Sequence, residues 1–381
     1  MRIIVTGATS MLGCALIDEC TKKNTEVMAI VRKGSLRENR IPASPLVHIV
    51  HADIDDLDKI EYDGREYDAL YHFAWGHTSK LDRNLATAQE KNIRDTLLVA
   101  DFAAKFHCKK FVFAGSQAEY GSIDGVITPD TNPKPITAYG MAKLSAGMLS
   151  RLTCEQNNIT HIWTRIFSVY GIRDQEWTMI KYAIDSFSKG VKASFSAGTQ
   201  MWNYLYETDA GKMFYLLGEK DVSNGIYHIA SADTRPLREY IEQICDVWDK
   251  NVVDAGVKSD AFNVMDNAGV KSDAFDVMDN AGVKSDAFDV MDDAGDGVKN
   301  DDGASVKNDP GAGVKKDVGA SVKKDAGASV KKTAVCEFGT YDSKNKIVGI
   351  QPDISETVKA IGFVPEVSFE QGISNIIDWK M

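Results

Sequence analysis

Residues 6–13 read TGATSMLG and directly follow the apolar run Ile3-Ile4-Val5. A glycine-rich turn between a buried strand and a helix is a common binding place for the pyrophosphate of a dinucleotide, because the first N–H groups of the helix point at it. Ser10 stands where the middle glycine of the pattern G-x-x-G-x-x-G would be. The stretch predicts a strand, a tight turn and a helix, and it leaves open whether the turn still binds a nucleotide.

Short β-rich runs alternate with helical stretches from Met1 to about Ile166. Such alternation predicts an α/β chain with a doubly wound parallel sheet, and continuous apolar strands are expected where helices cover both faces of the sheet. After residue 166 the pattern mixes helical periodicity with one further strand candidate at 225–231. The predicted strands of the first part are 2–7, 26–31, 46–53, 68–75, 109–116 and 159–166.

The stretch 251–332 contains no Leu, Ile, Trp, Tyr, Arg or Glu, and it is repetitive. Phenylalanines recur there with a period of 13 and valines with a period of 8, at Phe262, Phe275 and Phe288 and at Val298, Val306, Val314, Val322 and Val330. Neither period matches a known solenoid unit. We expect this stretch to be mostly disordered, and the spacing of its aspartates does not fit a calcium-binding EF-hand loop.

The net charge of −11 argues against a nucleic-acid or anionic-membrane partner, because binding to phosphate groups needs a clustered basic surface. The six cysteines form no C-x-x-C pair and lie near no histidine cluster, so we expect neither a disulfide framework nor a zinc site. The apolar patch at the N-terminus is too short for a signal peptide or a membrane span. These features predict a cytoplasmic protein without a metal site.

Tyr139 and Lys143 lie four residues apart in YGMAK and therefore share one face of a predicted helix. An ammonium beside a phenol favours the phenolate, which suits a general acid/base for the interconversion of an alcohol and a ketone. Ser116 ends a predicted strand, at the sheet edge where doubly wound folds bind ligands. The ordinary alternatives are a surface Tyr/Lys pair and a turn serine.

These motifs occur together with others in a characteristic order. The glycine turn, YHFAWG at 71–76, Asn92, the Ser116 strand, the Tyr139/Lys143 pair, RIFSVYG at 165–171 and the closing stretch at 352–373 follow one another. In this combination the chain resembles the extended short-chain dehydrogenase/reductase superfamily, within it the NAD-dependent epimerase/dehydratase family that acts on nucleotide sugars. The resemblance covers nearly everything except residues 251–334.

The resemblance implies a domain organisation. Residues 1–166 would form an NAD(P)-binding Rossmann-like domain, with later contributions near 205–230. Residues 167–250 and 335–381 would form a small α/β substrate-binding subdomain. The repeats at 251–334 would be a low-complexity insert within that subdomain.

The resemblance also implies roles for single residues. Tyr139 would be the acid/base, Lys143 would orient the nicotinamide ribose and tune Tyr139, and Ser116 would bind the sugar hydroxyl or ketone. Gly7 and Gly13 would still shape the pyrophosphate turn, while Ser10 would either hydrogen-bond the phosphate or move it slightly outward. The implied cofactor-binding residues are Gly7, Ser10, Met11, Leu12, Gly13, Arg32, Asp53, Ile54, Phe73, Ala74, Asn92, Tyr139 and Lys143.

Arg32, followed by Lys33 and Ser35, stands where NAD-preferring relatives place an acidic residue. An arginine there suits a ribose 2′-phosphate, so we expect NADP to be preferred over NAD. For five other side chains, the sequence does not decide between a role in packing or ion pairing and a role in ligand binding. These are Trp75, at a family position near the nicotinamide, Trp202, in the segment leading to Asp209, and Arg173, Arg235 and Arg238 as candidates for the substrate diphosphate.

The resemblance implies an NAD(P)-dependent epimerase that acts on a nucleoside-diphosphate sugar through a 4-keto intermediate, and a homodimer built from helices near 86–106 and 139–156. A 4,6-dehydratase is disfavoured, because Gln117 and Ala118 replace the acidic pair that such enzymes carry after the hydroxyl residue. An NADPH-dependent 4-ketoreductase is one alternative. Another is a non-catalytic nucleotide sensor or a scaffold whose repeat insert is the functional part.

Overall fold

The computed structural model describes residues 1–79, 82–254, 333–339 and 349–380. The repeat insert, for which we predict disorder, lies almost entirely outside these ranges. All statements about the fold below refer to the described residues.

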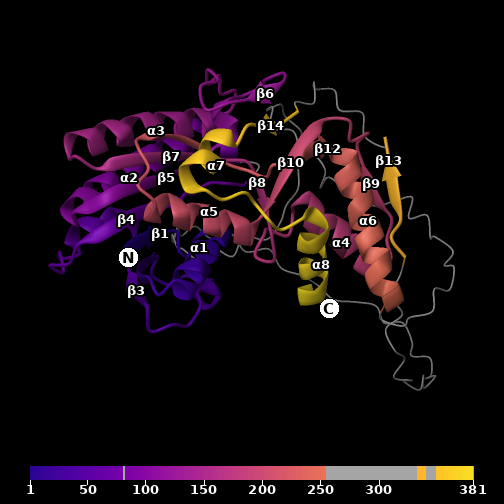
Figure 1. Cartoon of the computed structure of the whole chain (residues 1–381), viewed down its shortest axis with the longest axis horizontal. Coiled ribbons are helices and arrows are strands. Elements are labelled where there is room, and N and C mark those ends of the chain that lie inside the picture. Colours follow the sequence, from indigo (N-terminus) through magenta and orange to yellow (C-terminus); the bar gives the residue numbers. More distant parts are fainter. Residues whose placement is uncertain (80–81, 255–332, 340–348, 381) are drawn as a thin grey trace, which may run out of the picture. The chain divides into compact units, whose positions relative to one another are not determined.

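The described residues contain a seven-stranded parallel sheet with the strand order β11-β7-β5-β4-β1-β2-β3 (Figure 1). The order reverses beside β1, so the chain is wound in both directions from a central strand, as the alternating sequence pattern predicts. The last strand is the candidate at 225–231, which pairs with β7 in parallel. The strands are β1 (Arg2–Thr6), β2 (Glu26–Val31), β3 (Val47–His51), β4 (Tyr67–His72), β5 (Cys108–Ser116), β7 (Thr160–Ile166) and β11 (Gly225–Ile229).

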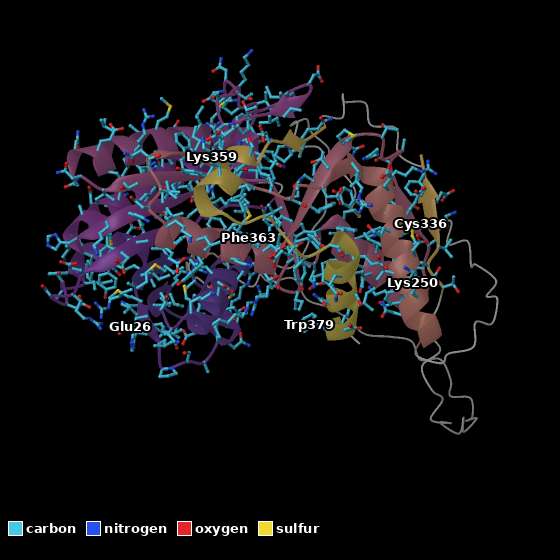
Figure 2. All side chains as sticks on the ribbon, viewed as in Figure 1. Glu26, Lys250, Cys336, Lys359, Phe363 and Trp379 are labelled. Carbon is cyan, nitrogen blue, oxygen red and sulfur yellow. A yellow bond between two sulfur atoms is a disulfide. The ribbon has the colours of Figure 1, made fainter. Side chains whose placement is uncertain are left out.

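Helices cover both faces of this sheet, which explains why its central strands are largely buried and mostly apolar. On one face α1 (Met11–Lys22) packs against α5 (Glu207–Glu219), and on the other α2 (Ala86–Lys105) packs against α3 (Ala138–Gln156) (Figure 1). The short helix α7 (Ser355–Ile361) also lies on the first face, where Ile361 and Phe363 join the same core (Figure 2). The Rossmann-like doubly wound fold is confirmed.

A second hydrophobic core lies around a smaller set of strands and helices. Its sheets pair β12 (Thr234–Pro236) with β10 (Met201–Tyr206) and β8 (Ser168–Tyr170), β13 (Cys336–Phe338) with β9 (Ala193–Phe195), and β14 (Gln351–Pro352) with β6 (Val126–Ile127). Its helices are α4 (Met179–Lys189), α6 (Leu237–Asp254) and α8 (Phe369–Lys380). Short helices lie in the connections between the main elements: η1 (Glu38–Arg40), η2 (Ile54–Lys59), η3 (Asp82–Asn84) and η4 (Gln117–Glu119). The predicted domain boundaries themselves stay predictions.

The expectation that no cysteines pair is wrong for one pair. Cys245 of α6 and Cys336 of β13 form a disulfide, although they are 91 positions apart in the sequence. Cys336 is labelled in Figure 2. The pairing of β13 with β9 brings the two together, and spacing along the chain gives no hint of it. The other four cysteines, Cys14, Cys20, Cys108 and Cys154, are free and buried.

Candidate active site

The glycine turn after β1 has two positions that only glycine fits. Gly7 has a positive φ of 69°, and a Cβ there would lie 2.5 Å from the backbone nitrogen of Ala74. A Cβ on Gly13 would lie 2.5 Å from the carbonyl oxygen of Gly7. The turn therefore bends sharply against the end of β4 and brings α1 close to β1.

Ser10 is the N-cap of α1 and fills the place of the missing middle glycine. Its Oγ accepts a hydrogen bond from the backbone N–H of Gly13 at 3.0 Å. Because the first turn of a helix offers no carbonyl partners to its N–H groups, those of Met11 and Leu12 remain to bind an anion, assisted by the positive end of the helix dipole. The Ser10 hydroxyl accepts in this bond and keeps its own hydrogen for a further acceptor. These features fit a pyrophosphate.

The next two strands end beside this turn. Arg32 is exposed and directly follows β2, and Asp53 and Ile54 follow β3 at the start of η2. Since β1, β2 and β3 are parallel neighbours, these three residues lie at the same sheet edge as Gly7. Asp53 is partly buried and is the N-cap residue of η2, but its side chain makes no capping hydrogen bond, so its carboxylate is available there.

The loop after β4 is braced by Asn92 of α2. Its Oδ1 accepts from the N–H of Gly76 at 2.8 Å and its Nδ2 donates to the carbonyl of Gly76 at 3.1 Å. Phe73, at the start of that loop, is buried and donates its N–H to Thr6. The structure thus gives Asn92 a bracing role, through which it shapes the loop that contains Ala74 and contacts Gly7.

Ser116 ends β5 and caps η4. Its Oγ accepts from the N–H of Ala118 at 3.2 Å, while its own N–H donates to Glu119 at 2.7 Å. Glu119 is fully buried and pairs with Arg165 of β7 at 2.7 Å. This capping box and the buried ion pair together hold the backbone of Ser116 at the carboxyl edge of the sheet.

Lys143 lies buried on α3, one turn after Tyr139. Its Nζ donates to the carbonyl oxygen of Ala114 at 2.6 Å and lies 3.5 Å from the centre of the Trp75 ring. The same Nζ is 5.9 Å from the centre of the Tyr139 ring. Burial lowers the pKa of the Lys143 ammonium to about 7, the Arg83 charge also lowers it, and Glu119 acts against both.

Tyr139 lies on the first turn of α3, whose N-cap is Thr137. Burial raises the pKa of its phenol above the ordinary value, and the Arg83 charge and a hydrogen bond with Ser116 act against this shift. The ring also lies edge-on to Trp75, with centres 6.0 Å apart.

The structure therefore gathers Ser116, Tyr139, Lys143 and Trp75 into one cluster beside the end of β4 and β5. The other candidates lie elsewhere. Trp202 is buried in the second core on β10, opposite Arg235 of β12. Each of the three arginines has a carboxylate partner: Arg173 pairs with Asp18 at 2.8 Å, Arg235 with Asp233 at 3.3 Å and Arg238 with Glu242 at 2.8 Å.

Comparison with known proteins identifies the family of the chain. The sequence profile of the NAD dependent epimerase/dehydratase family matches residues 3–230. The chain belongs to that family.

Two curated relatives and one solved structure illustrate the range of the family. An uncharacterized UDP-glucose epimerase of Bacillus subtilis is 23% identical over 266 residues, which cover 65% of this chain and 82% of the relative. A dTDP-glucose 4,6-dehydratase of an Actinoplanes species is 24% identical over 264 residues, 64% of this chain and 82% of the relative. The structure of UDP-glucuronic acid 4-epimerase from Bacillus cereus in complex with NAD superposes with a TM-score of 0.66 at 18% identity, over 100% of this chain and 98% of that one.

Two residues of this family member were not anticipated from its sequence. Glu119 could have been found, because Ser116 and Glu119 have the S-x-x-E spacing of a capping box. Arg83 of η3, whose guanidinium carbon lies 4.3 Å from the centre of the Tyr139 ring, carries no sequence signal. It lies more than fifty residues from Tyr139 and comes near only through the packing of η3 on α3.

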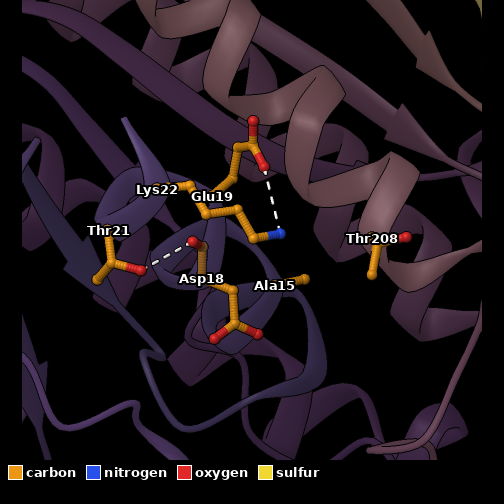
Figure 3. A pocket seen from close by; sticks show the side chains of 6 residues that line it. All are labelled: Ala15, Asp18, Glu19, Thr21, Lys22 and Thr208. Atoms are coloured by element: carbon orange, nitrogen blue, oxygen red, sulfur yellow. Dashed lines mark hydrogen bonds and ion pairs between the residues drawn. The ribbon is translucent and has the colours of Figure 1, made fainter. Parts of the chain in front are cut away.

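A cavity of about 270 Å³ lies between α1 and Thr208 of α5 (Figure 3). Its other lining residues are Ala15, Asp18, Glu19, Thr21 and Lys22. None of the candidate site residues lines it, and Lys22 and Glu19 form an ion pair within it at 3.6 Å. The cavity is therefore separate from the cluster around Tyr139.

The described ranges contain neither a candidate metal centre nor a helix that could span a membrane. Within them, no group of three or more His, Cys, Asp and Glu side chains is arranged to hold a metal ion. None of the described helices combines the length and the apolar character needed to cross a membrane.

Proposed function

We propose that this family member is an NAD(P)-dependent epimerase that inverts C4 of a nucleoside-diphosphate sugar. The observation that carries the proposal is the convergence of Ser116, Tyr139 and Lys143 next to the glycine turn of Gly7. Strand ends β1, β4 and β5 are neighbours in the sheet, so a ligand bound at the turn would extend toward these three side chains.

The turn would hold the cofactor pyrophosphate through the N–H groups of Met11 and Leu12, with Ser10 Oγ as a further donor. Asp53 and Ile54 would lie at the adenine end, and Phe73 and Ala74 beside the middle of the cofactor. Bound NAD(P) would supply the acceptance and return of a hydride at the sugar C4.

The remaining chemistry belongs to the side chains of the chain. Tyr139 would take the proton of the C4 hydroxyl as the 4-keto sugar forms. It would return the proton after the sugar has rotated to present its opposite face to the nicotinamide. Ser116 would hydrogen-bond the same oxygen throughout. Lys143 would bind the nicotinamide ribose, and its lowered pKa makes its charge sensitive to pH near neutrality.

A 4,6-dehydratase is not favoured, although one relative bears that name. Elimination of water needs an additional acid and base near the sugar C5 and C6. Here η4 offers Gln117 and Ala118 after Ser116, and its only acid, Glu119, is committed to Arg165.

An NADPH-dependent 4-ketoreductase is the second candidate, and Arg32 is the observation that favours it. Arg32 and Lys33 are both exposed after β2, on the strand next to the glycine turn. Two cations there suit a 2′-phosphate. A reductase would deliver the hydride once and release oxidised cofactor.

The test combines cofactor identification with two assays. The purified protein is heat-denatured and the released nicotinamide is identified by mass spectrometry, and the stripped protein is titrated with NADH and NADPH. UDP-glucose, UDP-glucuronic acid and UDP-N-acetylglucosamine are then followed by NMR for inversion at C4, with Tyr139→Phe as the inactive control. Inversion without net cofactor consumption supports the epimerase. Stoichiometric NADPH oxidation with a 4-keto sugar nucleotide supports the reductase, and failure to bind either cofactor overturns both.

We also propose that the protein is a homodimer through the outer face of α3. Met141, Met148, Leu149 and Leu152 lie along that face and are each 43–54% exposed. Such a stripe of exposed apolar side chains is typical of a protein interface. Sedimentation velocity should give a dimer for the wild type and a monomer for Met148→Glu/Leu152→Glu, whereas Val364→Glu, at an exposed valine outside this face, should leave the dimer intact. A monomeric wild type would contradict the proposal.

A further inference from the structure

Arg83 packs directly on the candidate catalytic tyrosine. It lies on η3 just before α2, is partly buried, and places its guanidinium carbon 4.3 Å from the centre of the Tyr139 ring. Asn84 of the same turn accepts a hydrogen bond from the N–H of Ala138 at 3.4 Å. That bond joins η3 to the first turn of α3 and so helps to hold Arg83 beside Tyr139.

The guanidinium has no carboxylate partner among the described residues. Its neighbour Asp82 instead lies 3.7 Å from the imidazole of His77. In the described part of the chain, no side chain accepts a hydrogen bond from the Arg83 guanidinium. A partly buried cation of this kind, stacked on a ring, directs its charge at that ring.

Lys143, the residue to which the family resemblance gives the tuning role, is placed differently. Its Nζ is 5.9 Å from the centre of the Tyr139 ring and is bonded to the carbonyl of Ala114. Trp75 covers it at 3.5 Å. Arg83 is therefore the nearer cation to the Tyr139 ring.

We propose that Arg83 is a positioning residue for proton transfer, whose stacked guanidinium is the fixed positive charge that favours the phenolate form of Tyr139. Its consequence for catalysis rests on the proposed function, whereas the effect on the phenol does not.

The electrostatics around the phenol agree with this placement. Burial raises the Tyr139 pKa, the Arg83 charge is the largest influence that opposes the rise, and Ser116 follows by a hydrogen bond, while the charge of Glu119 adds to the rise. Burial lowers the pKa of Lys143 to about 7, so its charge fades as the pH rises through neutrality. A guanidinium stays charged throughout that range. Of the charged groups around Tyr139 on η3, η4 and α3, Arg83 thus supplies the lasting positive charge.

A titration that needs no enzymatic activity tests the proposal. A difluorotyrosine, whose phenol is more acidic than that of tyrosine and so titrates in an accessible range, is incorporated at position 139 of the full chain and followed by fluorine NMR. Arg83→Gln should raise the phenol pKa by roughly one unit or more, as expected for the loss of an opposite charge within about 4–6 Å. Arg83→Lys should restore much of the shift. Arg65→Gln is the matched control, because Arg65 is 45% exposed and precedes β4 at the opposite edge of the sheet.

The outcomes separate the possibilities. A shift in Arg83→Gln that Arg83→Lys reverses, with none in Arg65→Gln, supports the proposal. A shift below roughly 0.3 units overturns it, and so do equal shifts in Arg83→Gln and Arg83→Lys, because altered packing rather than charge would then move the phenol. With an active sugar nucleotide, the acidic limb of kcat/KM should move upward by the same amount in Arg83→Gln. If no substrate is found, the proposed function fails while the titration still decides the role of Arg83.

Discussion

Replacement of Glu119 by glutamine should destabilise the protein by about 3–5 kcal/mol, the usual cost of breaking a buried ion pair by removing one partner. Glu119 and Arg165 are 0% and 2% exposed and lie 2.7 Å apart. At an effective dielectric constant of ~20, opposite unit charges at that separation interact by about 6 kcal/mol, and desolvation of the two groups reduces the net gain. The guanidinium of Arg165 cannot lose its proton, so the variant leaves a buried charge without compensation.

Glutamine has nearly the shape of glutamate, yet it cannot replace the hydrogen bonds. The carboxylate accepts from Arg165 at 2.7 Å and from the N–H of Ser116 at 2.7 Å. Whichever way the amide turns, its NH₂ group faces one of these donors. The variant should therefore also disturb the backbone at Ser116.

Urea unfolding at pH 7, followed by tryptophan fluorescence and circular dichroism, measures the effect. Glu155→Gln is the matched control, because Glu155 forms a pair with Arg151 that is more than half exposed on α3, and its loss should cost less than about 0.5 kcal/mol. The double variant Glu119→Gln/Arg165→Met should recover part of the lost stability. A loss below about 1 kcal/mol in Glu119→Gln would refute the assignment of a buried, uncompensated charge.

Three further changes have expected outcomes. Gly7→Ala should cost at least about 1–2 kcal/mol from its left-handed backbone alone, and the clash of its Cβ with Ala74 should abolish the binding of NAD(P) in a calorimetric titration. Lys143→Met should be more stable than the wild type by about 1–3 kcal/mol at pH 7. Urea unfolding should show that this difference in stability shrinks as the pH rises toward 10. The reason is that the lysine of the unfolded chain keeps its proton up to its ordinary pKa, whereas the folded one loses it near pH 7. Asn92→Leu should remove two hydrogen bonds to Gly76 at a cost of about 1–3 kcal/mol, and faster hydrogen exchange of the Gly76 N–H should report it; unchanged exchange would show that other contacts hold the loop.

The alternation of apolar runs and helical stretches was enough to predict the sheet, including the late strand β11. Short, mostly apolar runs without polar alternation are typical of strands in a parallel sheet that helices cover on both faces, so local composition specifies this part of the fold. The order and spacing of the motifs likewise singled out Ser116, Tyr139 and Lys143 as candidate site residues. The sequence did not reveal the pair Cys245–Cys336, because its proximity depends on the pairing of β13 with β9.

Two further side-chain roles became visible in the hydrogen bonds of the folded chain, one local and one between separate elements. Ser10 proved to be a helix cap for Gly13, and Asn92 proved to brace the loop at Gly76. Both residues stand where the family pattern would place cofactor contacts, and each has a local hydrogen-bond partner that the pattern does not name.

The sequence by itself determined the strands of the seven-stranded sheet, the glycine turn and the one-turn spacing of Tyr139 and Lys143, because each depends on residues within a few positions of one another. Only the tertiary structure decided which cation lies nearest the Tyr139 ring. Arg83 reaches it through the packing of a short turn on α3, whereas Lys143, one helical turn away in sequence, is drawn to the carbonyl of Ala114. The effect of a charge depends on its distance in space. Here the distance from Arg83 to the Tyr139 ring results from packing between segments that are far apart in the sequence.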